Sequence, residues 1–159
     1  MARRKKNYRE SDVFAVPLRD GGFAVGVVAC SSAGSIILGY FFGPRHEVVP
    51  TSDVACQLNP TEPVLIRLVG ALGLLNGEWP IIGSIDNWES EKWPLPKFLH
   101  ENPSRPEECF LVTYNRKNLN APPVAVEPID CALASGYPED VMSGYGAVEI
   151  RLTRLLPKV

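Results

Sequence analysis

The sequence has few residues of the kinds that carry metal or nucleophilic chemistry. Its two histidines, His46 and His100, each stand alone in a polar, proline-flanked stretch, and its four cysteines are isolated from one another. No Cys-x-x-Cys pair occurs, which argues against a zinc knuckle. A glycine-rich phosphate loop, a nucleophile elbow and a paired-histidine motif are absent as well. The sequence therefore offers no common enzyme motif, although a cysteine and a histidine that meet only in the folded chain would escape this search.

Long apolar runs and a secretory signal are also missing. The longest apolar runs, such as residues 36–42 with their internal Gly39, are far shorter than the ~20 residues of a membrane-spanning helix. No signal-peptide pattern occurs at the N-terminus. We therefore expect a cytoplasmic protein without membrane contact, in which all the cysteines are free thiols. These cysteines are Cys30, Cys56, Cys109 and Cys131.

Basic residues are scarce outside the N-terminus. Of the 16 lysines and arginines, five lie in the first ten residues, opposed only by Glu10, and the rest of the chain holds 11 basic and 17 acidic residues, a net charge of −6. This balance argues against a nucleic-acid-binding face and favours encounter with a basic partner. We expect residues 1–10 to form a flexible basic tail, followed by a single β-rich domain over residues 11–159.

Proline and glycine, by contrast, are plentiful. The 159 residues include 15 prolines and 13 glycines, and both residue types interrupt helices and populate turns. The first apolar segments, residues 13–18 and 23–28, flank an Asp-Gly-Gly turn and predict a β-hairpin. Residues 35–42 are almost continuously apolar, which predicts a third strand that is buried on both faces and ends at Gly43-Pro44.

Later segments are shorter and more interrupted. We expect strands at residues 64–69 and 110–114, and a strand after Pro80 at a sheet edge or a bulge, because proline lacks the amide hydrogen that a ladder needs. Residues 128–134 are expected to begin a short helix. The alternation of apolar and polar side chains in residues 147–156 favours a strand with one solvent face, and a helix remains the alternative.

Together these patterns predict a mainly β fold with a minor α component. The expected architecture is a small curled antiparallel sheet or an SH3-like half-barrel, with long loops and one or two short helices. The sequence shows no internal repeat and no domain boundary.

Residues 85–106 are expected to be mostly loop, and loops of that length are often functional. The loop holds three carboxylates around two tryptophans: Asp86, Trp88, Glu89, Glu91 and Trp93. The carboxylates could bind a divalent cation or transfer protons, but their spacing fits no calcium-loop template. A charged loop whose tryptophans fold back onto the sheet is a second interpretation, and a recognition surface for a basic partner is a third. We take these five residues as the candidate partner-binding site, with no metal site.

Several stretches of the chain follow a pattern shared with a known family. Residues 11–28 are similar to an opening in which Gly-Asp-hydrophobic-Phe and Pro-Leu precede an Asp-Gly turn and an aromatic-Gly-x-Gly strand, with Ser11 in place of the usual glycine. Residues 77–83 are similar to a Gly-x-Trp-x-hydrophobic-hydrophobic-Gly motif, followed by Pro94-Leu95-Pro96, and the strand at residues 36–42 matches too. On these motifs the chain resembles family 26 of the bacterial polymorphic-toxin immunity proteins.

The resemblance implies a protein that neutralises a cognate toxin domain in the cytoplasm, stoichiometrically and by occluding the toxin's active site. It implies no cofactor and no catalytic residue, so the chain is not expected to be an enzyme. Two alternatives stay open: a small β-barrel module that binds nucleic acid or a peptide, and a small hydrolase that uses the Asp86, Glu89 and Glu91 cluster.

Overall fold

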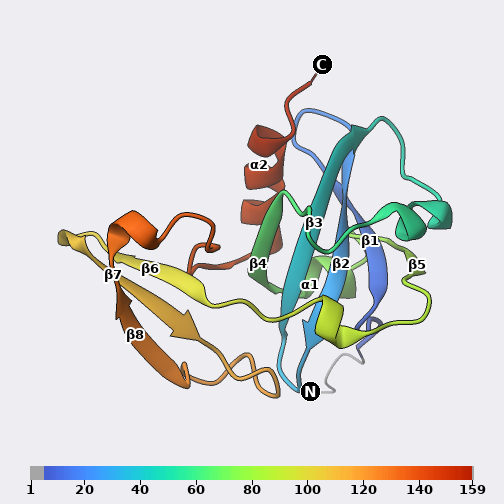
Figure 1. Ribbon diagram of the computed structural model, residues 1–159. Coiled ribbons are helices and arrows are strands. Elements are labelled where there is room, and N and C mark those ends of the chain that lie inside the picture. Colours follow the sequence, from blue (N-terminus) through green and yellow to red (C-terminus); the bar gives the residue numbers. More distant parts are fainter. Residues whose placement is uncertain (1–5, 159) are drawn as a thin grey trace.

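The computed structural model describes residues 6–158, which form two β-sheets (Figure 1). The larger sheet has six strands in the order β5-β1-β2-β3-β4-β9. These strands are β1 (Asp12–Pro17), β2 (Phe23–Ser31), β3 (Ile36–His46), β4 (Leu65–Gly70), β5 (Ile81–Ser84) and β9 (Met142–Ser143). The smaller sheet, in the order β6-β7-β8, consists of β6 (Phe98–Asn102), β7 (Arg105–Thr113) and β8 (Ala125–Ile129).

Helices are few and short. They are α1 (Leu72–Leu75), α2 (Tyr145–Leu155) and the 3-10 helices η1 (Ser52–Gln57), η2 (Ser90–Lys92) and η3 (Cys131–Leu133). The expectation of a mainly β fold is confirmed. Within residues 6–158 the sheets do not close into a barrel, and the pairing of β4 with β9 is parallel. No helix among these residues is long and apolar enough to cross a membrane.

The predicted hairpin is confirmed as β1 and β2. Its turn contains Gly21 and Gly22 at φ angles of 109° and 79°, a region that residues with a side chain seldom adopt. The next strand, β3, does not end at Gly43-Pro44 as expected but continues to His46, which pairs with Phe23. The β2–β3 register shifts just before this pair. A bulge is one of the few places where a strand can contain proline, so the shift accommodates Pro44.

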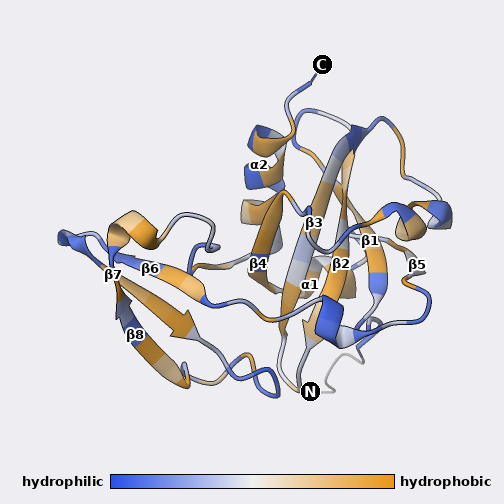
Figure 2. Ribbon diagram, viewed as in Figure 1, coloured by the Kyte–Doolittle hydropathy of each residue, from blue (hydrophilic) through white to orange (hydrophobic). Residues whose placement is uncertain are grey.

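Strand β3 is buried on both faces, as its apolar run predicted. Ile37 and Phe41 point into one hydrophobic cluster, on the side of the sheet that α2 covers. Leu38, Tyr40 and Phe42 point into a second cluster on the opposite side. Figure 2 shows the central strands of the large sheet as mainly hydrophobic ribbon. The sheet is therefore the middle layer of the molecule, with packed side chains on both sides.

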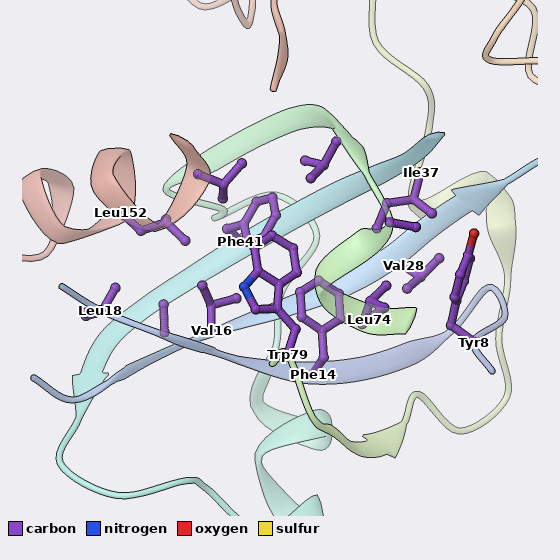
Figure 3. Packing of buried hydrophobic residues seen from close by; sticks show 14 residues of the cluster. Tyr8, Phe14, Val16, Leu18, Val28, Ile37, Phe41, Leu74, Trp79 and Leu152 are labelled. Carbon is purple, nitrogen blue, oxygen red and sulfur yellow. The ribbon is translucent and has the colours of Figure 1, made fainter. Parts of the chain in front are cut away.

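Trp79 lies at the centre of the first cluster (Figure 3). Its ring stacks on Phe14, with ring centroids 5.3 Å apart, and meets the edge of Phe41 at 5.9 Å. Its indole nitrogen Nε1 donates a hydrogen bond of 3.0 Å to the buried carboxylate of Glu149 on α2. Trp79 thus joins the sheet to the helix by both packing and a buried polar contact.

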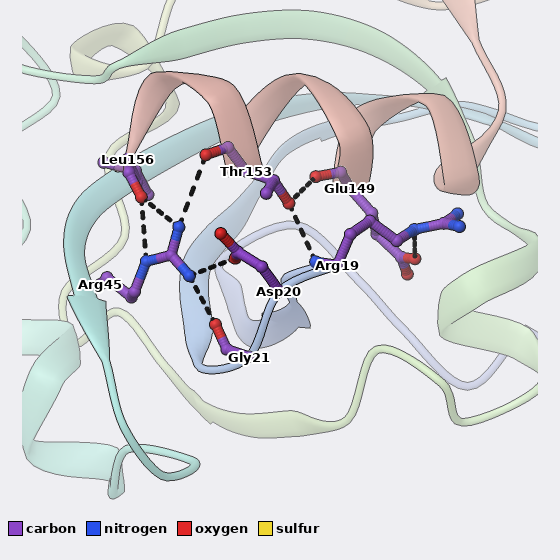
Figure 4. Close-up of polar contacts among 7 residues, drawn as sticks. All are labelled: Arg19, Asp20, Gly21, Arg45, Glu149, Thr153 and Leu156. Carbon is purple, nitrogen blue, oxygen red and sulfur yellow. Dashed lines mark hydrogen bonds and ion pairs between the residues drawn. The ribbon is translucent and has the colours of Figure 1, made fainter. Parts of the chain in front are cut away.

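The turn between β1 and β2 also holds α2 (Figure 4). Arg19 pairs with Glu149 at 3.2 Å, and the Arg19 backbone N–H donates to Thr153 Oγ1 at 2.9 Å. Near the helix C-terminus, Arg45 Nε donates to the Leu156 carbonyl oxygen at 2.9 Å. Cationic donors at the last carbonyls satisfy groups that have no partner within the helix.

The C-terminal segment is the helix α2 and not the strand that its alternation favoured. Val148 and Leu152 are fully buried one turn apart, while Ile150 is exposed. A strand would have placed Ile150 on the same face as Val148 and Leu152. The segment is helical because only a helix places Val148, Leu152 and the Glu149 carboxylate on the side that packs against the first cluster.

The remaining segments agree with their predictions only in part. The helix expected at residues 128–134 is reduced to η3, and the residues before it belong to β8. Strand β5, which follows Pro80, lies at the edge of the large sheet as predicted. The segment expected to be mostly loop, residues 85–106, contains η2 and β6.

Two of the four cysteines form a disulfide, so the expectation of four free thiols is wrong. Cys109 on β7 is bonded to Cys131 on η3, with their Cα atoms 5.4 Å apart. These residues are 22 apart in the sequence, and they meet because β8 turns back along β7. Cys30 is free and buried, and Cys56 is free and exposed.

Residues 1–5 of the expected tail lie outside the described residues. The part of the tail that is described packs on the body. Tyr8 is buried in the first cluster, and the Asn7 side chain donates to the Leu74 carbonyl oxygen at 2.9 Å. Residues 7 and 8 therefore pack against the domain.

The disulfide generates a prediction about stability. Replacing both Cys109 and Cys131 by serine should lower the free energy of unfolding by about 3 kcal/mol, the chain-entropy value for a loop of this size. Urea unfolding of the oxidised protein and the variant measures this difference. As a control, thiol titration of the unfolded oxidised chain should count two thiols, and four after reduction. A count of four before reduction would show that the bond does not form.

A second prediction concerns the buried contact between Trp79 and Glu149. The change Glu149→Leu leaves the indole N–H buried without an acceptor and should cost about 2 kcal/mol in the free energy of unfolding. Glu149→Gln, which keeps an acceptor oxygen, should cost less. Ile150→Leu, at an exposed position of the same helix, serves as the matched control and should change stability by less than about 0.5 kcal/mol.

Candidate functional site

The five residues singled out in the sequence lie on one loop that crosses the second hydrophobic cluster. Trp93 is 3% exposed, and its ring meets the edges of Tyr40 at 5.2 Å and Phe42 at 6.0 Å on β3. Trp88 stacks on Trp93, with ring centroids 5.5 Å apart, and remains half-buried. The tryptophans therefore fold back onto the sheet and anchor the loop.

A hydrogen bond fixes the end of the same loop. The Tyr40 hydroxyl donates to the Pro94 carbonyl oxygen at 2.6 Å. Burial raises the pKa of Tyr40 to about 12, so the hydroxyl keeps its proton and remains a donor at neutral pH. The position of residues 88–94 thus depends on contacts with β3.

With its aromatic side chains turned inward, the loop presents its carboxylates to solvent. Asp86, Glu89 and Glu91 are all exposed. Glu89 pairs with Lys92 at 3.2 Å, in an exposed contact that contributes little to stability. Asp86 lines a hollow of about 660 Å³ between η1 and β5, together with Asp53 of η1. Asp53 could not be assigned to this site from the sequence, because η1 and the loop are distant in the chain.

Charge in the sequence segment that contains η1 and this loop is one-sided. Between residues 46 and 96 the chain has seven acidic residues and only two basic ones, Arg67 and Lys92. Arg67 is buried, so Lys92 is the one exposed cation of the segment. A surface region of one sign produces a field that attracts a partner of the opposite sign. We call the exposed carboxylates of η1 and of the loop the acidic face: Asp53, Asp86, Glu89 and Glu91.

The structure places the candidate residues in two groups. The carboxylates Asp86, Glu89 and Glu91 are accessible to a partner, and Trp88 is partly so. Trp93 is a core residue whose ring a partner cannot reach while the loop stays folded. An imbalance of charge over residues 46–96 is the sequence signal that would have extended the site to Asp53.

Groups that could carry other chemistry lie elsewhere. His100 Nδ1 is 3.4 Å from Asp140 Oδ2, and Asp140 also accepts a hydrogen bond from the Tyr114 hydroxyl. Burial, with the hydrogen bond to Asp140, raises the pKa of Tyr114. Burial likewise raises the pKa of the Cys30 thiol, which disfavours the nucleophilic thiolate. Among residues 6–158 no group of three or more histidine, cysteine or acidic side chains is arranged to hold a metal ion.

Comparison with known proteins gives one match. The model of the family described as immunity protein 26 matches residues 9–109, which include strands β1 to β6 and the whole acidic face. No curated protein and no solved structure matches the chain. Since the matched segment spans well over half of the chain, the protein belongs to the immunity protein 26 family.

Proposed function

We propose that this chain neutralises a cognate bacterial toxin domain by binding it stoichiometrically through the acidic face. Family membership supports an immunity role. The exposed carboxylates on η1 and on the loop support the acidic face as the binding surface. A toxin domain that acts on an anionic substrate has a basic cleft, and an acidic face complements such a cleft in charge.

The proposed mechanism is steric and electrostatic. Long-range attraction raises the rate of encounter, and the docked loop then covers the toxin's active site. No bond is made or broken in this chain, so the proposal requires no cofactor and no catalytic residue. It places the action in the cytoplasm, where the toxin would otherwise damage the producing cell.

Trp88 is proposed as the aromatic anchor of the interface. It is partly exposed, it is held rigidly by stacking on Trp93, and carboxylates flank it at Asp86 and Glu89. Rigid aromatic residues surrounded by polar groups often dominate the binding energy of protein interfaces. Trp93 acts in this scheme only as the support of Trp88.

The electrostatic part is tested by neutralising the acidic face. The triple variant Asp86→Asn, Glu89→Gln, Glu91→Gln should slow association with the cognate toxin domain by about tenfold at low salt, because the steering charge is lost. Surface plasmon resonance with a catalytically inactive toxin measures this rate at several salt concentrations.

The matched control removes three charges from the smaller sheet instead. The variant Glu101→Gln, Glu107→Gln, Glu108→Gln has the same net charge as the first triple variant and should associate almost like the natural chain. Equal losses in the two variants would mean that net charge alone matters, and the acidic face would then not be the interface.

The anchor is tested separately. Trp88→Ala should weaken toxin binding by at least ~2 kcal/mol, mainly through faster dissociation, whereas Trp88→Phe should retain part of the affinity. Thermal unfolding of both variants checks that the loop still folds. Trp93→Ala is unsuitable for this purpose, because emptying a buried tryptophan site costs about 3–5 kcal/mol of stability. Unchanged affinity of Trp88→Ala would remove Trp88 from the interface.

A further inference from the structure

Strand β4 has an outer edge that is only partly paired. On its inner side, β4 pairs with β3 from Leu65 to Gly70. On its outer side, β9 pairs only with Leu68 and Val69. Within residues 6–158, Leu65, Ile66 and Arg67 therefore have no strand beside them on that side. In Figure 1 this edge of the large sheet faces the smaller sheet.

A hollow of about 480 Å³ lies along this free edge. It is lined on one side by residues 63–67 and on the other by residues 136–139. The backbone of the second wall is engaged elsewhere. The Leu99 N–H of β6 donates to the Pro138 carbonyl at 2.7 Å, and the Asp140 N–H donates to the Leu99 carbonyl at 2.7 Å. The second wall therefore provides no hydrogen bonds to the backbone edge of β4.

The hollow carries an unbalanced positive charge. Arg67, whose side chain is 8% exposed, donates through Nη1 to Ser143 Oγ at 3.1 Å, and its Nη2 lies 3.5 Å from Glu139 Oε2. Its Nε is buried and has no hydrogen-bond partner. Arg151 of α2 lines the same hollow. The charged residues that line the hollow are thus two arginines and one carboxylate, and that carboxylate, Glu139, is 61% exposed.

This arrangement is unfavourable for Arg67. Burial lowers the pKa of Arg67, the nearby charge of Arg151 lowers it further, and Glu139 offsets only part of the effect. A buried charge is stabilised when a well-placed opposite charge and full hydrogen bonding surround it. Glu139 is largely exposed and Arg67 Nε has no partner, so a carboxylate entering the hollow would gain two cationic neighbours.

We propose that this groove binds an extended peptide segment of a partner protein, which adds as a strand beside Leu65, Ile66 and Arg67 and places a carboxylate between Arg67 and Arg151. The unpaired edge supplies main-chain hydrogen bonds, and the arginines select an acidic side chain. Three free residues correspond to about 10 Å of strand, so the bound segment is short. Val64 and Tyr137, both partly exposed beside the groove, would contact neighbouring apolar side chains.

The groove is distinct from the acidic face. Strand β4 lies four strands from β5, which borders the hollow that contains Asp86. The inference therefore does not depend on the proposed toxin contact, and its test needs no toxin.

Nuclear magnetic resonance of the full-length, ¹⁵N-labelled protein tests the groove with defined probes. The first probe is a five-residue peptide, blocked at both ends, with a central glutamate between two valines and a threonine at each end. Its addition should shift the backbone amide signals of Leu65, Ile66 and Arg67 and the Nε–H signal of Arg67. A peptide with glutamine in place of glutamate, and one with N-methylated valines, should each bind at least about fivefold more weakly, because one lacks the charge and the other lacks backbone donors.

Two surface variants with opposite expected effects complete the test. Arg151→Gln should weaken binding of the glutamate peptide by about fivefold and leave binding of the glutamine peptide unchanged. Glu139→Gln removes the competing carboxylate and should strengthen binding of the glutamate peptide. Amide spectra of the free variants show whether each is folded.

Three results would overturn the proposal: no shift at residues 65–67 at millimolar peptide, equal affinity for the glutamate and glutamine peptides, or weaker binding by Glu139→Gln.

Discussion

The contact of Trp79 with Phe14 and Glu149 is the interaction on which the fold depends. The Trp79 ring fills the space between β1, β3 and α2. Its indole N–H donates to the Glu149 carboxylate, which also pairs with Arg19. A buried tryptophan needs both a close-packed surround and an acceptor for its N–H. Here one side chain of α2 supplies the acceptor, so the packing of the sheet and the placement of the helix are set together.

The second face of the sheet positions the loop of the proposed partner-binding surface. Because Trp93 packs against β3 and Trp88 stacks on Trp93, the loop that carries them exposes its carboxylates and only part of the Trp88 ring. The acidic face is thus a consequence of how the loop is anchored, and its charges sit on a rigid support. Such preorganisation reduces the entropy lost when a partner binds.

The sequence predicted what local patterns determine and missed what distant contacts determine. The hairpin of β1 and β2, the doubly buried β3 and the edge position of β5 followed from turn residues, a continuous apolar run and Pro80. The helix α2, the parallel β9 and the Cys109–Cys131 disulfide did not, because each depends on segments brought together by the whole fold. The site follows the same division, since the carboxylates near Trp88 were visible in the sequence, whereas the contribution of Asp53 and the burial of Trp93 were not.

Val148 and Leu152 lie beyond the segment that the family model matches, and yet they complete the core that this segment builds. A natural exchange of residues 9–109 between family members would have to preserve the fit to this helix. The side chains of residues 9–109 and those of α2 that meet in this core should therefore change in concert.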